Sequence, residues 1–363
     1  AKNHLIPGVG SKIVNPDKKY YNVQLSLDYY IQQALEETLD RHGRRNGGVI
    51  VDIKSGDILA LASRPQFLQY KVDDSNNEQD CFWSIPLKAF PPGSVFKIIV
   101  AAAALEGKNY SENSRFFCNG GKTINGVHYS CHPSTNGLGD ITLRQAFAYS
   151  CNDTFIDIAI NIGGYNIENL AKKFGLGCSL NIGIQNDEGN LPQKDEYAGA
   201  GMGNLAIGQG KVMATPLQIA DILCTIANEG YRKPLKLIKA IISPTGNIKE
   251  WNYGKKAEKI ISTSTALQLQ NWMGDVTEYG TGKLAQSSQV LGTAGKTGTA
   301  QVSGDPYTKH YGWFAGFFPV NEPRYAIVIL CRKEGEGGKT AAPIFKEVAE
   351  SIRKYENELY NLK

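Results

Sequence analysis

The sequence lacks both an apolar run long enough to cross a membrane and a strong excess of charge. Its longest uninterrupted apolar segment is Ile98–Leu105, whereas a spanning helix needs about 20 residues. Basic residues number 39 and acidic residues 35, a net charge of +4 that is too small to argue for a nucleic-acid partner. The start at Ala1 is typical of a processed or trimmed chain, so an anchor could have been removed.

The sequence also lacks an even number of cysteines, internal repeats and low-complexity tracts. Seven cysteines cannot all pair within one chain, and most of them, such as Cys224 and Cys331, stand in apolar stretches typical of buried thiols. Their number alone does not fix the redox compartment. Hydrophobic residues make up 42% of the chain, which is ample for a folded core. The length of 363 residues predicts two domains, or one large domain with a smaller attachment.

Periodicity predicts an α+β fold. A hairpin is expected from the runs at Val49–Ile53 and Ile58–Ala62, which flank a glycine turn. Helices are expected around Ile31–Leu39 and over Val95–Leu105, Thr142–Ile162, Leu217–Asn228, Ser264–Glu278 and Ala342–Tyr355, and strands over Gly295–Val302, Gly312–Phe318 and Tyr325–Cys331. This order predicts an antiparallel sheet formed from both chain ends, flanked by helices, with a helical subdomain.

Three short motifs that carry reactive side chains follow one another along the chain. They are Ser94-Val95-Phe96-Lys97, Ser150-Cys151-Asn152 and Lys296-Thr297-Gly298-Thr299. Each motif alone is common by chance, and the ordinary interpretations are a solvated helix face or a turn. Their order and their surroundings make the pattern informative.

The first motif predicts a nucleophile beside a base. If Ser94 opens a helix, Lys97 lies on the same helix face, and the apolar surroundings lower the pKa of that lysine. The free N–H groups at a helix start can also stabilise an oxyanion. The alternative is a serine N-cap followed by a lysine that extends to solvent.

The third motif predicts a peptide-binding strand edge. An extended substrate can pair with the backbone of a strand, and Gly298 would let its backbone approach closely. Lys296 with the hydroxyls of Thr297 and Thr299 would supply a cation and donors for a carboxylate.

Together the motifs resemble those of the serine penicillin-recognising enzymes. Further stretches are similar to class B penicillin-binding proteins: Pro91-Pro92-Gly93-Ser94, Gly208-Gln209-Gly210, Ala214-Thr215-Pro216-Leu217-Gln218, Gly280-Thr281-Gly282, Gly312-Trp313-Phe314-Ala315-Gly316-Phe317 and Gly338-Lys339-Thr340-Ala341-Ala342-Pro343-Ile344-Phe345. The resemblance covers roughly residues 25–355. It implies a penicillin-binding transpeptidase domain over residues 25–363, preceded by a linker or remnant at 1–24.

The resemblance implies a D,D-transpeptidase that cross-links peptidoglycan and is acylated by β-lactams. In this interpretation Ser94 is the nucleophile, Lys97 its base and Ser150 the proton relay. Asn152 holds the substrate amide, and Lys296, Thr297, Gly298 and Thr299 set the electrostatics and the carboxylate site. The N–H groups of Ser94 and Thr299 form the oxyanion hole, and catalysis needs no cofactor.

The implied substrate is a stem peptide ending in D-Ala-D-Ala, and the implied partner is a membrane glycan polymerase. The implied location is the outer face of the bacterial cell membrane, with the anchor outside this chain. Rival interpretations are a serine β-lactamase, a D,D-carboxypeptidase and a catalytically silent β-lactam sensor. The chain contains no recognisable deacylating glutamate motif, which argues against a β-lactamase.

Cysteine and histidine are dense between positions 118 and 151, which invites a zinc site. The expected ligands are Cys118, Cys131 and His132, with Cys151 less certain because it is the middle residue of a catalytic motif. The alternatives are a Cys118–Cys131 disulfide and free thiols, because no ligand pair has a diagnostic two-residue gap.

Overall fold

The structure is a computed structural model and describes residues 20–43, 45–67, 81–131, 136–251, 256–305, 308–332 and 335–361. Over these residues, no helix combines the length and the apolar composition that a membrane span needs.

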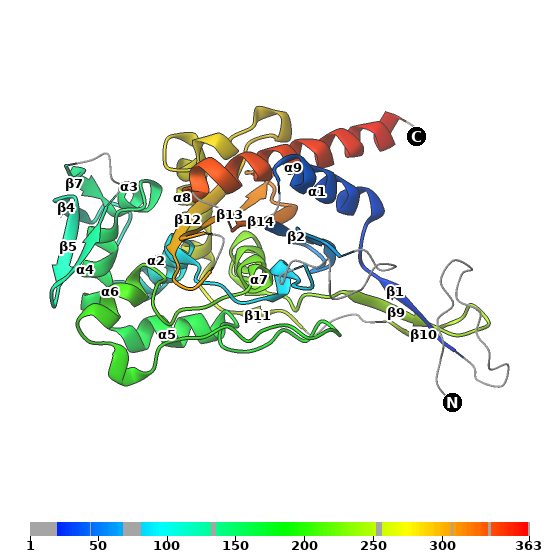
Figure 1. Ribbon diagram of the computed structural model, residues 1–363, viewed down its shortest axis with the longest axis horizontal. Coiled ribbons are helices and arrows are strands. Elements are labelled where there is room, and N and C mark those ends of the chain that lie inside the picture. The colour runs from blue at the N-terminus through cyan, green and yellow to red at the C-terminus, as the bar shows by residue number, and fades with distance from the viewer. Residues whose placement is uncertain are drawn as a thin grey trace.

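A five-stranded antiparallel sheet forms the centre of the fold (Figure 1). Its strands, in spatial order, are β12 (Ala294–Gln301), β13 (His310–Phe318), β14 (Tyr325–Cys331), β2 (Asn46–Asp52) and β3 (Ile58–Ser63). The two ends of the chain meet where Ile327 of β14 lies opposite Ile50 of β2. The predicted α+β class, the hairpin and the sheet built from both ends are therefore confirmed.

Two helices cover one face of this sheet. They are α1 (Tyr29–Arg41) and α9 (Gly337–Asn361), which lie side by side in Figure 1. Leu35 of α1 and Phe345 of α9 are fully buried against the strands. Each helix has one apolar stripe, which is the pattern of a helix packed on a sheet.

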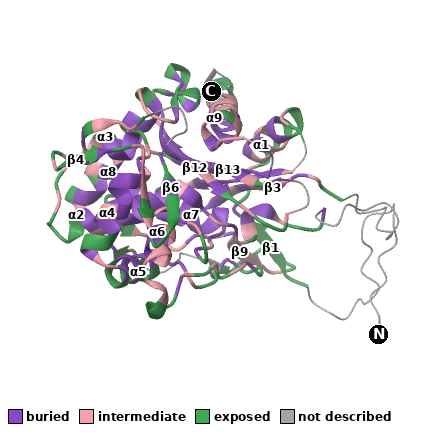
Figure 2. Ribbon diagram, turned by 60° about the vertical axis from the view of Figure 1, so that its left-hand side comes forward, coloured by how far each residue is buried: buried purple, intermediate pink, exposed green. Residues whose placement is uncertain are grey.

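The other face carries the helical subdomain. Its helices are α2 (Lys97–Glu106), α3 (Leu143–Ala148), α4 (Asn152–Ile162), α5 (Gly164–Lys173), α6 (Ala200–Ala206), α7 (Pro216–Ala227) and α8 (Thr263–Glu278). Nearly every residue of α2 is buried, as expected for a helix that is apolar all round. Figure 2 shows the buried residues concentrated in these helices and in the sheet.

Shorter strands make small sheets at the periphery. They are β1 (Asn22–Leu25), β9 (Ile238–Ile242) and β10 (Ile248–Trp251) in one sheet, β8 (Tyr231–Arg232) with β11 (Glu258–Lys259), β4 (Arg115–Cys118) with β7 (Gly139–Thr142), and β5 (Gly121–Ile124) with β6 (Val127–Ser130). The β1–β9–β10 sheet projects from the body of the molecule (Figure 1).

The single helix expected over Thr142–Ile162 is wrong. The chain leaves α3 after Ala148 and starts α4 at Asn152, and Ser150 lies between them with φ of +58°. Both helices bury apolar residues, so the hydrophobic pattern continues across the break. No glycine or proline marks the turn, and the left-handed position is instead taken by a serine.

The start of the Ser94 helix also differs from the expectation. Ser94 lies in a 3₁₀ turn, Gly93–Phe96, and the α-helix α2 begins at Lys97. Side chains three residues apart eclipse in a 3₁₀ turn, so Ser94 and Lys97 still lie on one side of the chain although no α-helix joins them.

Candidate active site

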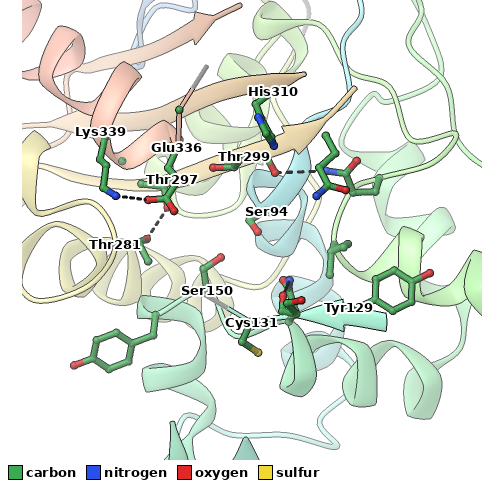
Figure 3. Close-up of a pocket in the computed structure, with 18 of the residues that line it drawn as sticks. Ser94, Tyr129, Cys131, Ser150, Thr281, Thr297, Thr299, His310, Glu336 and Lys339 are labelled. Atoms are coloured by element: carbon green, nitrogen blue, oxygen red, sulfur yellow. Dashed lines mark hydrogen bonds and ion pairs between the residues drawn. The ribbon is translucent and has the colours of Figure 1, made fainter. Parts of the chain in front are cut away.

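The three motifs border one cleft of about 1150 Å³ between β12 and the β5–β6 hairpin. Ser94, Ser150, Asn152, Thr297 and Thr299 all line it. In Figure 3, Ser94 lies between Thr299 on one side and Ser150 on the other. The fold thus brings together residues that lie some 200 positions apart in the chain.

The Ser94 segment is fixed against β12 and its neighbours. Gly93 donates its N–H to the carbonyl of Gly208 at 2.9 Å, and the Trp313 indole donates to the Pro91 carbonyl at 3.0 Å. Gly93 has φ of +55°, and a Cβ there would lie 2.6 Å from the Thr299 carbonyl oxygen. Only glycine fits this left-handed, crowded position, so the nucleophile's backbone is placed rigidly.

Lys97 connects the first motif to the second. Its buried ammonium donates to the Ser150 carbonyl and to Asn152 Oδ1, both at 2.6 Å, and to Ser150 Oγ at 3.2 Å. Within the described part of the chain, Lys97 makes no hydrogen bond to the Ser94 hydroxyl. The predicted base therefore lies beside the predicted relay, Ser150, in this structure.

Burial sets the protonation of both lysines. Lys97 has no exposed surface, and desolvation lowers its pKa to about 8, against the opposing effect of nearby cysteine thiolates. Desolvation also lowers the pKa of Lys296 well below its usual value, and the charge of Lys97 acts in the same direction. The charge of Lys97 therefore favours the neutral form of Lys296.

Asn152 has both ends of its side-chain amide engaged. Its Oδ1 accepts from Lys97, and its Nδ2 donates to the Ser130 carbonyl at 2.6 Å. Ser130 ends strand β6, so Asn152 ties the lysine to the opposite wall of the cleft.

Strand β12 is the edge of the main sheet. The Val302 N–H donates to the carbonyl oxygen of Lys309. Two residues earlier, Ala300 lies opposite Tyr311 of β13. Because backbone groups alternate in direction along a strand, those of Thr297, Thr299 and Gln301 point away from β13. The N–H of Thr299 therefore faces the cleft, as an oxyanion-hole donor requires.

The threonine hydroxyls have partners within the protein. Thr297 and Thr281 hydroxyls lie 2.6 Å apart, and Thr299 Oγ1 accepts from the Gly337 N–H at 3.1 Å. Thr281 was part of the Gly280-Thr281-Gly282 stretch in the sequence, but only the structure shows that its side chain supports the Lys-Thr-Gly strand.

Gly298 has a different use from the one expected. A Cβ at this position would lie 2.7 Å from the Pro92 carbonyl oxygen and 2.8 Å from Val95 Cγ2. The space on the Cβ side of Gly298 is therefore filled by the segment that carries Ser94, whereas the close approach of a ligand backbone along the strand edge stays a prediction. Glycine is needed there so that β12 and the nucleophile segment can pack together.

Three buried cysteines cluster at the second motif, of which Cys151 is the middle residue. Cys131 Sγ is 3.6 Å from Cys118 Sγ and 3.7 Å from Cys151 Sγ, and all three sulfur atoms lie within 4.8 Å of one another. A disulfide needs a separation of about 2.05 Å, so these thiols are free. His132 lies outside the described residues, whereas Cys151, the less certain sequence candidate, joins the cluster.

The sulfur geometry fits a tetrahedral metal. Zinc–thiolate bonds of about 2.3 Å place neighbouring ligand sulfurs about 3.8 Å apart, close to the two distances above. Hydrogen bonds from Cys151 and the Asp153 N–H lower the pKa of Cys131, which favours a thiolate there.

Comparison with known proteins gives the same family. The model of the penicillin binding protein transpeptidase domain matches residues 47–350. The chain is 33% identical to penicillin-binding protein PbpB of Mycolicibacterium smegmatis, over 90% of this chain and 53% of the relative. It is 30% identical to peptidoglycan D,D-transpeptidase PbpA of Mycobacterium tuberculosis, over 92% of this chain and 73% of the relative. The chain thus spans about half the length of the first of these relatives.

A solved structure agrees with the sequence comparisons. The penicillin G acyl-enzyme complex of penicillin-binding protein A from M. tuberculosis superimposes with a TM-score of 0.81 and 26% identity, over 92% of this chain and 80% of that one. Fold, motif order and sequence similarity lead to one conclusion: the chain belongs to the penicillin-binding protein transpeptidase family, as its resemblance to the class B members predicted.

Proposed function

We propose that this domain is a serine D,D-transpeptidase that cross-links peptidoglycan stem peptides through an acyl-enzyme on Ser94. The observation that carries the proposal is the bridge from the buried Lys97 ammonium to Ser150 and Asn152, in the cleft that Ser94 lines. The relative PbpA bears the name of this activity, and penicillin-binding protein A forms an acyl-enzyme with penicillin G.

In the first half-reaction, Ser94 Oγ attacks the carbonyl carbon of the penultimate D-alanine. Lys97 takes the hydroxyl proton, and the N–H groups of Ser94 and Thr299 stabilise the oxyanion. The bond from that carbon to the terminal D-alanine nitrogen breaks. Lys97 returns its proton through the hydroxyl of Ser150 to this nitrogen, so both side chains end as they began and free D-alanine leaves.

In the second half-reaction, an acceptor amine attacks the acyl carbon and loses a proton through Ser150. The new amide forms as the bond from the acyl carbon to Ser94 Oγ breaks, and the proton that Ser150 received returns through Lys97 to Ser94 Oγ. Lys296, with Thr297 and Thr299, supplies the environment for the donor carboxylate. A β-lactam acylates Ser94 in the same way, but its broken amide stays tethered, so no leaving group departs.

Intact mass spectrometry with penicillin G tests the proposal. We expect a lasting adduct of one drug molecule, and we expect Ser94→Ala to remove it without loss of the folded far-UV spectrum. Drug consumption without an adduct would indicate a β-lactamase, and an untouched drug would indicate a silent sensor. Donor turnover with an added amine separates a transpeptidase, which forms the amide, from a carboxypeptidase, which forms only the acid.

The cellular setting follows from the same proposal. The domain acts at the outer face of the bacterial cell membrane, where its peptidoglycan substrate lies. A membrane glycan polymerase supplies the strands that it cross-links.

We further propose that Cys118, Cys131 and Cys151 hold one zinc ion, with His132 as the predicted fourth ligand. The three sulfurs are buried at ligand-like separations, and Cys151 stands between Ser150 and Asn152 in the chain. Bound zinc would be structural, because it would tie β4 and β6 to the start of α4. Catalysis needs no cofactor in this scheme.

Native mass spectrometry tests the zinc proposal without an activity assay. We expect the mass of one zinc in the unchanged protein and its loss in Cys118→Ser. Cys224→Ser is the matched control, because Cys224 is buried but lies outside the cluster. A zinc-free protein with a two-proton mass deficit would instead establish a disulfide.

A further inference from the structure

Gln209 occupies the edge of β12 next to the position of Thr299. Its amide oxygen accepts from the Gln301 N–H at 3.1 Å, and its amide nitrogen donates to the Gln301 carbonyl at 3.3 Å. This exchange reproduces what a neighbouring strand would do at that residue. This amide orientation satisfies both backbone groups of Gln301, in place of one longer contact of 3.5 Å from the amide nitrogen to the Thr299 carbonyl.

The backbone around Gln209 is held in place. Its N–H donates to the Asn204 carbonyl at 2.8 Å, and the carbonyl of Gly208 accepts from Gly93. A Cβ on Gly208, which has φ of +69°, would lie 2.2 Å from the Gly93 carbonyl oxygen. Gln209 is therefore fixed to the segment that carries Ser94, and its side chain reaches across to β12.

The backbone N–H and carbonyl of Thr299 are the groups of β12 with which a donor peptide can pair. Thr299 directs its N–H and its carbonyl into the cleft, because the groups of Gly298 and Ala300 are directed to β13. A donor whose reacting carbonyl lies in the oxyanion hole accepts from the Thr299 N–H. If its own N–H donates to the Thr299 carbonyl, the two residues form one hydrogen-bonded antiparallel pair.

The next such pair would fall on Gln301. In an antiparallel ladder, hydrogen-bonded pairs recur every second residue, so Gln301 would face the donor residue two before the reacting one. Gln209 already takes both backbone groups there.

We propose that Gln209 is a positioning residue that ends donor-strand pairing after a single residue pair. Resting on the proposed transpeptidase function, this means that the backbone of the donor pairs with β12 at Thr299 alone. The donor chain upstream must leave the strand edge and be bound by side chains in the cleft. Gln209 thereby fixes the register, because a slipped donor finds no second pairing position.

Ester replacement of donor amides tests this proposal. The parent donor is an acetylated tripeptide thioester whose reacting residue is D-alanine, and in each analogue an ester oxygen replaces one backbone N–H. The penalty is the acylation rate constant of the parent divided by that of the analogue. Deleting the N–H of the reacting residue removes the bond to Thr299, so we expect a penalty in every active variant.

The informative analogue lacks the N–H of the residue two before the reacting one. We expect no penalty in the unchanged protein and about a two- to tenfold penalty in Gln209→Ala, where that N–H gains the Gln301 carbonyl. Gln209→Asn, one methylene shorter, serves as a second variant if the alanine protein does not fold. A role in stability alone would not change this ratio.

Two results would overturn the inference. One is a penalty in the unchanged protein equal to that in Gln209→Ala, which would mean that the donor displaces Gln209. The other is no penalty in any variant, which would mean that the Gln301 edge never pairs with a donor. Failure of the proposed function gives a different result. In that case no donor acylates the unchanged protein, which then behaves like Ser94→Ala.

Discussion

The ammonium nitrogen of Lys97 lies 2.6 Å from the amide oxygen of Asn152, which joins the first motif to the second. Two effects oppose each other at this nitrogen. Burial disfavours the charged form and lowers the pKa, whereas the nearby cysteine side chains, Cys151 first among them, favour the charged form. The balance places the lysine where a small change in its surroundings releases or takes up a proton.

Replacement of Lys97 tests its role as the base. Lys97→Ala is expected to slow acylation by penicillin G by about 10²–10⁴-fold, which is the usual contribution of general-base catalysis. Lys97→Arg is the matched variant: it keeps the positive charge but cannot take up a proton near neutral pH, so it should be equally impaired. The measurement is single-turnover acylation followed by intact mass. Recovery of activity in Lys97→Arg would show that only the charge is needed.

The acylation rate should rise with pH through the pKa of Lys97, about 8. Below that pKa the protonated lysine cannot accept the Ser94 proton, so the rate should fall roughly tenfold for each unit by which the pH is lowered. Above it the neutral amine predominates and the rate should level off. Single-turnover acylation with penicillin G, measured from about pH 6 to about pH 9, checks this. A flat profile would contradict a titrating lysine base.

Gly298→Ala should displace the segment that carries Ser94, although the new methyl group does not contact Ser94 itself. The new methyl would lie 2.7 Å from the Pro92 carbonyl oxygen, and overpacking of this kind costs roughly 1–3 kcal/mol of the free energy of unfolding. We expect a lower Tm and slower acylation of Ser94.

The control is Gly274→Ala, in helix α8, where the nearest atom to a new Cβ is 3.8 Å away. It should raise the free energy of unfolding by up to about 1 kcal/mol through helix propensity and leave acylation unchanged. Equal acylation in Gly298→Ala and the unchanged protein would show that the nucleophile segment tolerates displacement.

Ser150 separates backbone strain from chemistry. Its φ of +58° is unfavourable for residues with a Cβ, so Ser150→Gly should be more stable than Ser150→Ala by about 1 kcal/mol. Both variants lack the hydroxyl and should be equally slow in acylation. Denaturant unfolding and single-turnover kinetics measure the two effects. A faster glycine variant would mean that backbone geometry, rather than the hydroxyl, limits the reaction.

The sequence by itself determined the motifs, their order and the main elements. The strands at 295–302, 312–318 and 325–331 and the buried helix after Ser94 are visible locally, because apolar periodicity and glycine positions report burial and turns. The same local signals could not reveal the break at Ser150. Apolar residues continue through α3 and α4, and the turn uses a serine where a glycine would have marked it.

Only the tertiary structure decided which groups meet. Lys97 donates to Ser150 and Asn152, Cys151 lies with Cys118 and Cys131, and Gln209 closes the edge at Gln301. These contacts join residues far apart in the chain, and no periodicity encodes them. Gly298 shows the reason most clearly: a glycine indicates that space is short, but only the packed fold shows that the Ser94 segment, through Pro92 and Val95, fills that space.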